Sequence, residues 1–305
     1  MQSMTTENAL EADWFGEDQP EAARDRAADS SVAMKVLVDG LEPPPQVVTR
    51  VLALASNPDT GIAELREAIE GDAALVVRLV RLANSSAMAT RVRAASLDEA
   101  VLRLGTRRIR GITAGLAALG SFSREHAYAS AVRAHSTRVA MLAETLGREW
   151  RQAGASDLFL AGLVHDVGEL AILEADAMAP PDDPNADAST RHLEERETLG
   201  FDHAALGRVM LDAWKFPADV VSIVDLHHDA ARAYQVGGDV GAAVAILRLA
   251  EDLDDAFQDE DIMPVDFDAI GHRGECSYLS ISPAVLGGME TRLRAVLEDA
   301  ASLLK

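Results

Sequence analysis

The stretch that decides the fold of this chain reads Leu160-Ala161-Gly162-Leu163-Val164-His165-Asp166-Val167-Gly168-Glu169-Leu170. Its apolar residues predict a buried helix, yet a histidine and an aspartate stand side by side within it. An ionised carboxylate is almost never buried unless another group compensates its charge. A divalent metal is one such group, because imidazole and carboxylate are ligands that Zn, Fe, Mn and Ni accept. A helix N-cap or a lone His–Asp hydrogen bond is the simpler alternative.

The geometry of a continuous helix limits what this dipeptide can do. Adjacent helical residues point about 100° apart, so His165 and Asp166 can share one ion only over the helix edge between them. Glu169 lies one turn further on and shares that edge. We expect it to accept a hydrogen bond from a ligand imidazole and so fix the orientation of the ring. A solvated surface acid is the alternative.

Further histidines and acids end or interrupt other apolar helices. Five of the eight histidines in the chain are placed in this way. His135 lies in a helix with Val132, Val139 and Leu142, and Asp202 is a predicted N-cap before His203. Two more apolar runs end in polar groups of the same kinds, which are His227 and His228 in one run and Glu251 and Asp252 in the other. Surface histidines scattered at random would not be expected to show this pattern, although each one alone could be a hydrogen-bonded core residue.

The order of these groups resembles that of the HD-domain superfamily of metal-dependent phosphohydrolases and, within it, the HDOD family (HD-related output domain) of bacterial signalling proteins. Segments outside the histidine pattern resemble the same family. They are Leu41-Glu42-Pro43-Pro44-Pro45-Gln46-Val47, Ile69-Glu70-Gly71-Asp72-Ala73-Ala74-Leu75, Leu79-Val80-Arg81-Leu82-Ala83-Asn84-Ser85 and Ser96-Leu97-Asp98-Glu99-Ala100-Val101-Leu102-Arg103-Leu104-Gly105. The resemblance runs from about Val36 to about Asp255, which is most of the chain.

The resemblance implies a set of metal ligands and one or two divalent ions, of Fe, Mn, Zn, Ni or Mg. The residues that match the metal-binding positions are His135, His165, Asp166, His203, His227 and His228, and Asp166 would also be the catalytic residue of an active enzyme. Glu251 stands where the family pattern has aspartate, so it can be a ligand only if its helix sits farther back. Glu169 stands where the branch that degrades cyclic dinucleotides has lysine, and a carboxylate there would repel a phosphate.

Two functions from different classes follow from this resemblance. The first is a non-catalytic signalling module that holds a metal and binds a signalling protein partner. The second is a metal-dependent phosphohydrolase acting on a nucleotide or a cyclic dinucleotide. Hydrolysis needs an open coordination position and a nearby cation for the phosphate. Arg138, Arg191 and Lys215 are candidates for that cation. Glu169 and Glu251, which depart from the pattern of the catalytic enzymes, favour the signalling module.

Composition narrows the remaining possibilities. The 305 residues carry a formal charge of −22 and a sequence pI near 4.6, so we expect no nucleic acid or anionic membrane to bind through bulk charge. The single cysteine, Cys276, excludes an internal disulfide and favours a reducing compartment. No apolar run approaches the ~20 residues of a membrane span. We therefore expect a cytoplasmic protein.

The sequence predicts an all-α fold, a multi-helix bundle of helical hairpins with an HD-domain-like core. We expect an acidic disordered tail over 1–33, in which Trp14-Phe15 is an alternative docking motif. An N-terminal helical subdomain follows over 34–126 and an HD-like metal-site subdomain over 127–256. The expected C-terminal part, 257–305, is an irregular segment and a helix that starts at Ser282-Pro283. A polar loop over 178–187 is expected to be a lid or a spacer.

A basic island interrupts the acidic chain. Within residues 72–111, eight arginines face only Asp72, Asp98 and Glu99; they are Arg78, Arg81, Arg91, Arg93, Arg103, Arg107, Arg108 and Arg110. The simplest interpretation is that these arginines pair with acids of the protein itself. A partner or nucleotide surface is the next interpretation, and a helix-turn-helix DNA reader is the last.

Overall fold

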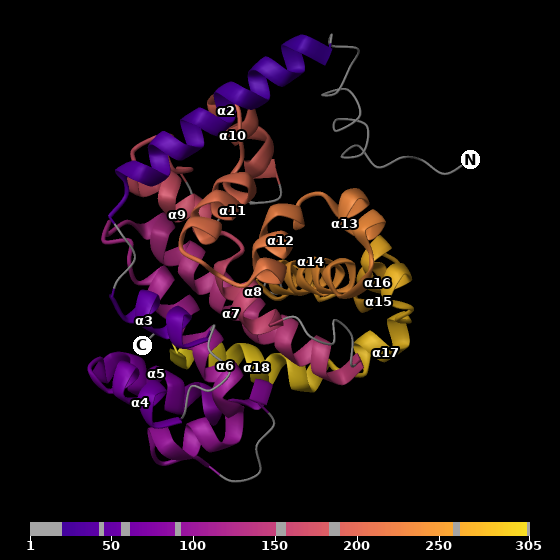
Figure 1. The fold of residues 1–305 in the computed structure, drawn as a ribbon. Helices are drawn as coiled ribbons and strands as arrows, with labels where there is room; N and C mark the ends of the chain where they lie inside the picture. Colours follow the sequence, from indigo (N-terminus) through magenta and orange to yellow (C-terminus); the bar gives the residue numbers. More distant parts are fainter. Residues whose placement is uncertain are drawn as a thin grey trace.

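The computed structural model describes residues 20–42, 46–55, 62–88, 93–150, 157–182, 190–258 and 263–303. Within these ranges all regular structure is helical, which confirms the predicted all-α fold (Figure 1). The N-terminal helices are α2 (Pro20–Gly40), α3 (Gln46–Ala55), α4 (Ile62–Glu70), α5 (Ala73–Ala83), the 3₁₀ turn η1 (Ser86–Met88) and α6 (Leu97–Leu119). Those that follow are α7 (Ala127–Trp150), α8 (Leu158–Val164), α9 (Val167–Glu174), α10 (Arg191–Leu199), α11 (His203–Ala213), α12 (Ala218–Leu226), α13 (Ala230–Val236), α14 (Gly238–Gln258), α15 (Phe267–Gly271), α16 (Gly274–Leu279), α17 (Pro283–Gly287) and α18 (Glu290–Leu303).

Helices α3 to α6 pack as hairpins around apolar residues that the sequence pattern placed inward. Ile69, Leu79 and Ile109 are fully buried. Side-chain caps begin two of these helices: the Asp72 side chain accepts the Leu75 N–H, and Ser96 accepts the Glu99 N–H. Helix α6 kinks at Gly105, whose left-handed φ of 79° suits a residue without a Cβ atom. The helix therefore continues beyond this glycine in a new direction.

Helix α7 organises the rest of the molecule, because α8, α14 and α18 all pack against it (Figure 1). Two of these contacts depend on glycines. A Cβ atom at Gly162 of α8 would lie 2.7 Å from the Cα of Ala140 on α7, and one at Gly147 of α7 would lie 2.1 Å from a methyl group of Leu158. The backbones thus approach closely, and this brings the end of α8 next to the middle of α7.

At both ends of the chain the structure contains more helix than the sequence pattern indicated. Residues 20–33 form the first part of helix α2, and in the last part of this helix Met34 is buried and Leu37 packs on the core. Trp14-Phe15 and the rest of 1–19 lie outside the described residues. The segment expected to be irregular contains the short helices α15 and α16, and the expected final helix is divided into α17 and α18. In each case contacts with distant elements stabilise helices that the local pattern did not indicate.

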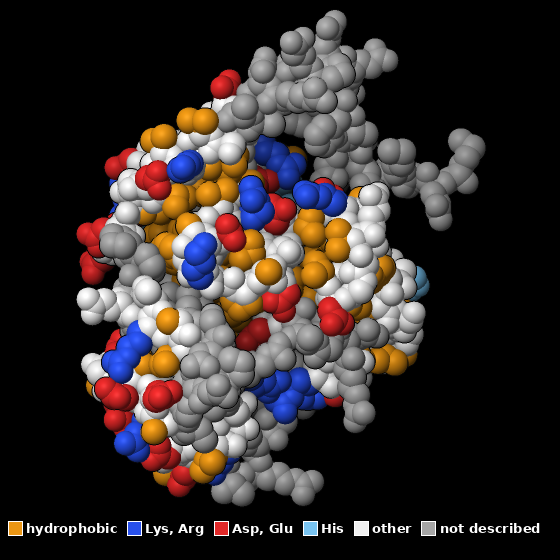
Figure 2. Space-filling model, viewed as in Figure 1, with side chains coloured by type: hydrophobic (Ala, Val, Ile, Leu, Met, Phe, Trp, Pro, Cys, Tyr) orange, Lys and Arg blue, Asp and Glu red, His pale blue; other side chains and the backbone are white. Residues whose placement is uncertain are grey.

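The surface mixes both charges with apolar side chains, as Figure 2 shows for one face. Several arginines of the basic island bind the protein's own acids: Arg103 lies 3.8 Å from Glu99, and Arg108 contacts Glu144. This supports the pairing interpretation for these two residues. Arg91 and the side chains of Arg107 and Arg110 lie outside the described structure. Among the described helices, none combines the length and apolarity needed to cross a bilayer.

Candidate metal centre

The His165-Asp166 dipeptide lies between two helices, not within one. Helix α8 ends at Val164 with His165 as its C-cap, and α9 begins at Val167 after Asp166. The expectation of a continuous helix through the dipeptide is therefore wrong. Asp166 leaves helical geometry with φ −97° and ψ 16°. Both side chains are buried, and the turn lets both face the same space, whereas on an uninterrupted helix they would point about 100° apart.

Four histidines turn the same ring atom outward, away from this space. The Nδ1–H of His165 donates to the Gly162 carbonyl at 2.9 Å, and that of His227 donates to the Val224 carbonyl at 2.7 Å. His135 and His203 donate instead to carboxylates. The acceptors are Asp254, at 2.8 Å, and Glu195, at 2.7 Å. Because each Nδ1 is used in this way, each Nε2 is left to face inward.

The four inward nitrogens surround the carboxylate of Asp166. Its Oδ2 lies 3.0 Å from His165 Nε2 and 3.6 Å from His135 Nε2. Its Oδ1 lies 3.5 Å from His203 Nε2 and 3.6 Å from His227 Nε2. The Nε2 atoms of His165 and His227 are buried and make no hydrogen bond within the described structure. Such orphaned nitrogens beside a shared carboxylate fit a metal centre, because a cation would satisfy all of them together.

The remaining predicted ligands lie in the same cluster. Glu251 Oε1 is 3.3 Å from His165 Nε2, so the longer glutamate reaches the centre. His228 Nε2 is 2.8 Å from His203 Nε2. The potential ligand atoms of His203, His227 and His228 all lie within 4.8 Å of one another, as do those of His135, His165 and Asp166. All seven side chains predicted to bind metal are therefore brought together, and two divalent ions could share Asp166.

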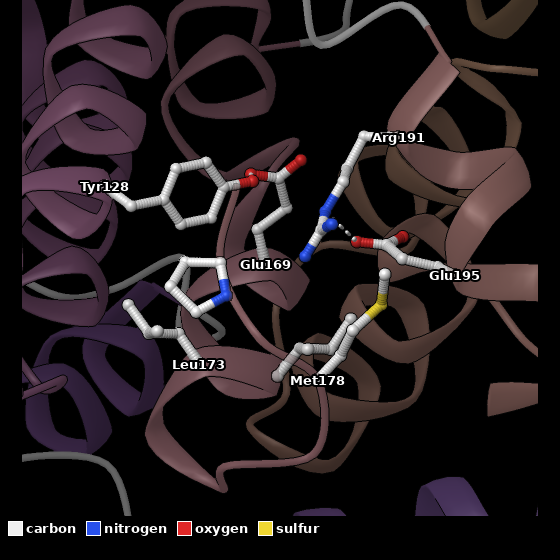
Figure 3. Close-up of a pocket in the computed structure, with 8 residues that line it drawn as sticks. Tyr128, Glu169, Leu173, Met178, Arg191 and Glu195 are labelled. Carbon is white, nitrogen blue, oxygen red and sulfur yellow. Dashed lines mark hydrogen bonds and ion pairs between the residues drawn. The ribbon is translucent and has the colours of Figure 1, made fainter. Parts of the chain in front are cut away.

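Glu169 is buried next to this cluster. The Tyr128 hydroxyl donates to Glu169 Oε2 (Figure 3). The other carboxylate oxygen of Glu169 lies 3.6 Å from His203 Nδ1. Arg191 lies between Glu169 and Glu195, and its Nε is 3.8 Å from Glu195 Oε1. Burial raises the pKa of Glu169 to about 7 although His203 opposes the shift. Of the two alternatives for Glu169, a solvated surface acid is wrong.

Neighbouring charges and burial shift the pKa values of the histidines in this cluster. Burial opposes charge on His165, but Asp166 and Glu251 outweigh it and hold the pKa of the imidazole well above its ordinary value. His203 behaves similarly: Glu195 and Glu169 outweigh burial and raise its pKa to about 10. Burial and the neighbouring His227 hold the pKa of His228 well below its ordinary value. Without a metal, protons on imidazoles thus supply the positive charge that Asp166 requires.

Sequence reasoning missed several groups that complete the site. Asp254 and Glu195 accept hydrogen bonds from ligand histidines, and Tyr128 binds Glu169. His192 stacks on His228 with centroids 4.2 Å apart and planes at 10°. One signal was available, because Asp254 follows Glu251 by three residues and so shares its helix face. The other contacts join elements that are distant in sequence.

The three candidate cations have different positions. Arg138 binds Asp254 through two bonds, of 2.6 and 2.9 Å, next to His135. Arg191 is buried beside Glu195 on the other side of the centre. Lys215 lies two residues beyond the end of α11, a helix that extends about 15 Å from His203 to Ala213 by the helical rise. The side chains of Arg138, His135 and Glu251 are each 20% exposed, so the centre is accessible along α7 and α14.

Comparison with known proteins finds one relative by sequence and several solved structures with a similar fold. An uncharacterized protein of Treponema pallidum (strain Nichols) is 25% identical over 214 residues; the match covers 63% of this chain and 39% of the relative's length. A proposed phosphohydrolase from Shewanella amazonensis SB2B has a similar structure, with a TM-score of 0.67 and 22% identity over 90% of this chain and 98% of its own. An HDOD domain protein with unknown function from Geobacter sulfurreducens has a TM-score of 0.63 and 18% identity, over 91% and 99% of the chains.

A family model gives the broadest match. It is the model of the HDOD domain, and it matches residues 41–230 of this chain. The match covers more than half of the sequence and includes all five histidines predicted to bind metal. The resemblance inferred from the histidine pattern is thereby confirmed.

Proposed function

Because this chain belongs to the HDOD domain family, we propose that it is a signalling output module whose HD-type centre binds one or two divalent metal ions and which acts by binding a protein partner. The observation that carries the metal site is the pair of buried, unpartnered Nε2 atoms of His165 and His227 beside Asp166. Buried polar atoms normally have a hydrogen-bond partner, so two buried imidazole nitrogens without one require an explanation. A cation bound between these nitrogens and the carboxylate of Asp166 provides it.

The ligands divide into two sets. His135, His165, Asp166 and Glu251 would hold one ion, and Asp166, His203, His227 and His228 would hold the other. The abundance of imidazole favours Fe, Mn, Zn or Ni over Mg, which prefers oxygen ligands. An ion held there supplies Lewis acidity toward an anionic ligand such as a phosphate or nucleotide.

The charges around the centre favour signalling over hydrolysis. Three arginines near the proposed ligands already have acidic partners, Arg138 with Asp254, Arg191 with Glu195 and Arg248 with Glu275. Glu169, buried and hydrogen-bonded to Tyr128, occupies the place where lysine would attract a phosphate in the catalytic branch. The positive charge of these arginines is therefore largely neutralised by their partners, and Glu169 would repel the phosphate of an ester bound at the centre.

A metal-dependent phosphohydrolase is the second candidate, on a nucleotide or cyclic dinucleotide. The observation that favours it is access: His135 and Glu251 are each one-fifth exposed, so a small anion can approach the centre. In this case Asp166, between the two ligand sets, would be essential for turnover.

Elemental analysis of the purified protein tests the metal site. We expect bound transition metal in the wild type and its loss in His165→Ala, with His272→Ala as the control, since His272 is exposed and far along the chain from the cluster. Absence of metal from wild-type protein, even after dialysis against Mn²⁺, Fe²⁺ and Zn²⁺, would refute the site.

A hydrolysis panel separates the two functions. Nucleotides, cyclic dinucleotides and phosphate monoesters are incubated with Mn²⁺- or Fe²⁺-loaded protein. We expect no turnover above that of Asp166→Ala. Turnover by the wild type that is lost in this variant would contradict the signalling-only function and establish the second candidate.

A further inference from the structure

The four histidines whose Nε2 atoms face Asp166 fall into two classes by the group that accepts a hydrogen bond from Nδ1. His165 and His227 donate to backbone carbonyls three residues earlier in the chain. His135 of α7 and His203 of α11 donate to side chains from other helices, Asp254 of α14 and Glu195 of α10. Each proposed ion would therefore be bound by one histidine hydrogen-bonded to a carbonyl and one hydrogen-bonded to a carboxylate. These pairs are His165 with His135, and His227 with His203.

An arginine lies against each of these two carboxylates. Arg138 lies three residues after His135 on α7. It donates two hydrogen bonds to Asp254, one from Nε at 2.6 Å and one from a terminal nitrogen at 2.9 Å. Arg191, four residues before Glu195 on α10, lies 3.8 Å from it, and Glu195 also accepts the His203 N–H at 2.7 Å. Asp254 and Glu195 are almost completely buried, so their charges require this compensation.

We propose that Asp254 and Glu195 are positioning residues of the metal centre, each fixing one ligand histidine with Nε2 turned toward Asp166. Arg138 holds Asp254 through two hydrogen bonds, and Arg191 compensates the charge of Glu195 as an ion pair at 3.8 Å. A backbone carbonyl and a carboxylate both keep the proton on Nδ1 and leave Nε2 free to bind a metal. A carboxylate also adds negative charge, which makes the imidazole a stronger electron-pair donor to the metal. The two Arg–carboxylate–histidine series approach Asp166 from opposite sides, through its Oδ2 and Oδ1 atoms. This inference rests on the proposed function, because it concerns residues that act through the metal ligands.

The chain offers a matched control for each carboxylate. Asp252 lies two residues from Asp254 on α14 and also pairs with an arginine, Arg273, without contacting a histidine in the described structure. Glu194 precedes Glu195 and lies 3.2 Å from the same Arg191, but its side chain is 60% exposed. Comparing Asp254→Asn with Asp252→Asn, and Glu195→Gln with Glu194→Gln, isolates the contact with the histidine.

The experiment is a Co²⁺ titration of the full chain, followed by visible absorption and by competition with a chelator. We expect Asp254→Asn and Glu195→Gln to bind Co²⁺ about 10–100-fold more weakly than the wild type and with altered absorption bands, because the ligand geometry changes. Asp252→Asn and Glu194→Gln should keep the wild-type affinity and spectrum.

Far-UV circular dichroism and melting curves check that each variant is folded. If Asp254→Asn does not fold, Arg138→Lys and Arg138→Gln replace it, and affinity should fall from wild type to Lys to Gln. Wild-type affinity and spectra throughout these variants would overturn the positioning role while leaving the metal centre intact. Failure of the wild-type protein to bind Co²⁺ would instead overturn the proposed function.

Discussion

Three buried acids show how charge is compensated at single residues. Asp254 binds Arg138, and Glu144 contacts Arg108, so each has a permanent cation. Asp166 is surrounded by imidazoles, whose charge depends on protons. Of the three, Asp166 is therefore the carboxylate at which a metal can replace protons without displacing an arginine.

Glu144 permits a prediction at this scale. Burial raises its pKa from 4.5 to about 7, so the folded protein keeps this proton at a pH where the unfolded chain has lost it. The contribution of Glu144 to the stability of the fold should therefore fall as the pH rises from 4.5 to 7. Glu144→Gln removes the titration, and its stability relative to wild type should increase over that interval by up to about 3 kcal/mol.

Urea unfolding at pH 5 and pH 8 measures this difference. Glu149→Gln is the control, since Glu149 lies on the same helix but is half exposed and pairs with Arg292 at the surface. A Glu144→Gln variant whose stability relative to wild type is the same at both pH values would contradict the prediction.

At the scale of elements, close helix crossings hold the ligands together. A Cβ atom at Gly168 of α9 would lie 2.0 Å from the carbonyl oxygen of His203, at the start of α11. Gly207 of α11 faces the same helix, with the Gly168 nitrogen 3.6 Å from its added Cβ atom. The backbones of α9 and α11 thus touch where Asp166 and His203 must meet. Larger side chains at these positions would separate the two ligands.

Gly162→Ala tests one such crossing. The added methyl would meet the backbone of Ala140 at 2.7 Å, and backbone cannot rotate away as a side chain can. We expect a loss of about 1–3 kcal/mol of stability and weaker metal binding, because the Gly162 carbonyl holds His165. Gly274→Ala has open space around it and should stay within about 0.5 kcal/mol of wild type in the same urea and Co²⁺ titrations.

At the scale of the whole molecule, the centre joins parts of the chain that are far apart. The proposed ligands extend from His135 to Glu251 and come from α7, the α8–α9 turn, α11, the end of α12 and α14. Ion binding would therefore require all of these elements in their folded positions. An ion that binds the folded state alone should stabilise the entire fold.

Thermal unfolding measures this coupling. Adding metal at about 100 times its dissociation constant should stabilise the wild type by about 2.7 kcal/mol, which raises the melting temperature by several degrees. A chelator should reverse the shift, and His165→Ala should show none. An equal shift in the wild type and in His165→Ala would indicate that the metal binds elsewhere.

Much of the local structure was predictable because its causes are local. The caps at Asp72, Ser96 and Asp202 follow from side chains three residues from the N–H they accept. The break between α8 and α9 was not predictable, since Val164 and Val167 continue the apolar pattern on either side of it. The α2 helix and the helices within 263–281 were missed for a related reason, namely that contacts with distant elements decide their stability.

The sequence by itself determined an all-helical fold and which histidines are the candidate metal ligands, because apolar periodicity and residue chemistry are properties of the chain alone. Only the tertiary structure decided that seven predicted side chains meet around Asp166, and that Asp254 and Glu195 stand behind two of them. The physical reason is distance: His135 and Asp254 are 119 residues apart in sequence, and their hydrogen bond exists only once α7 and α14 pack together.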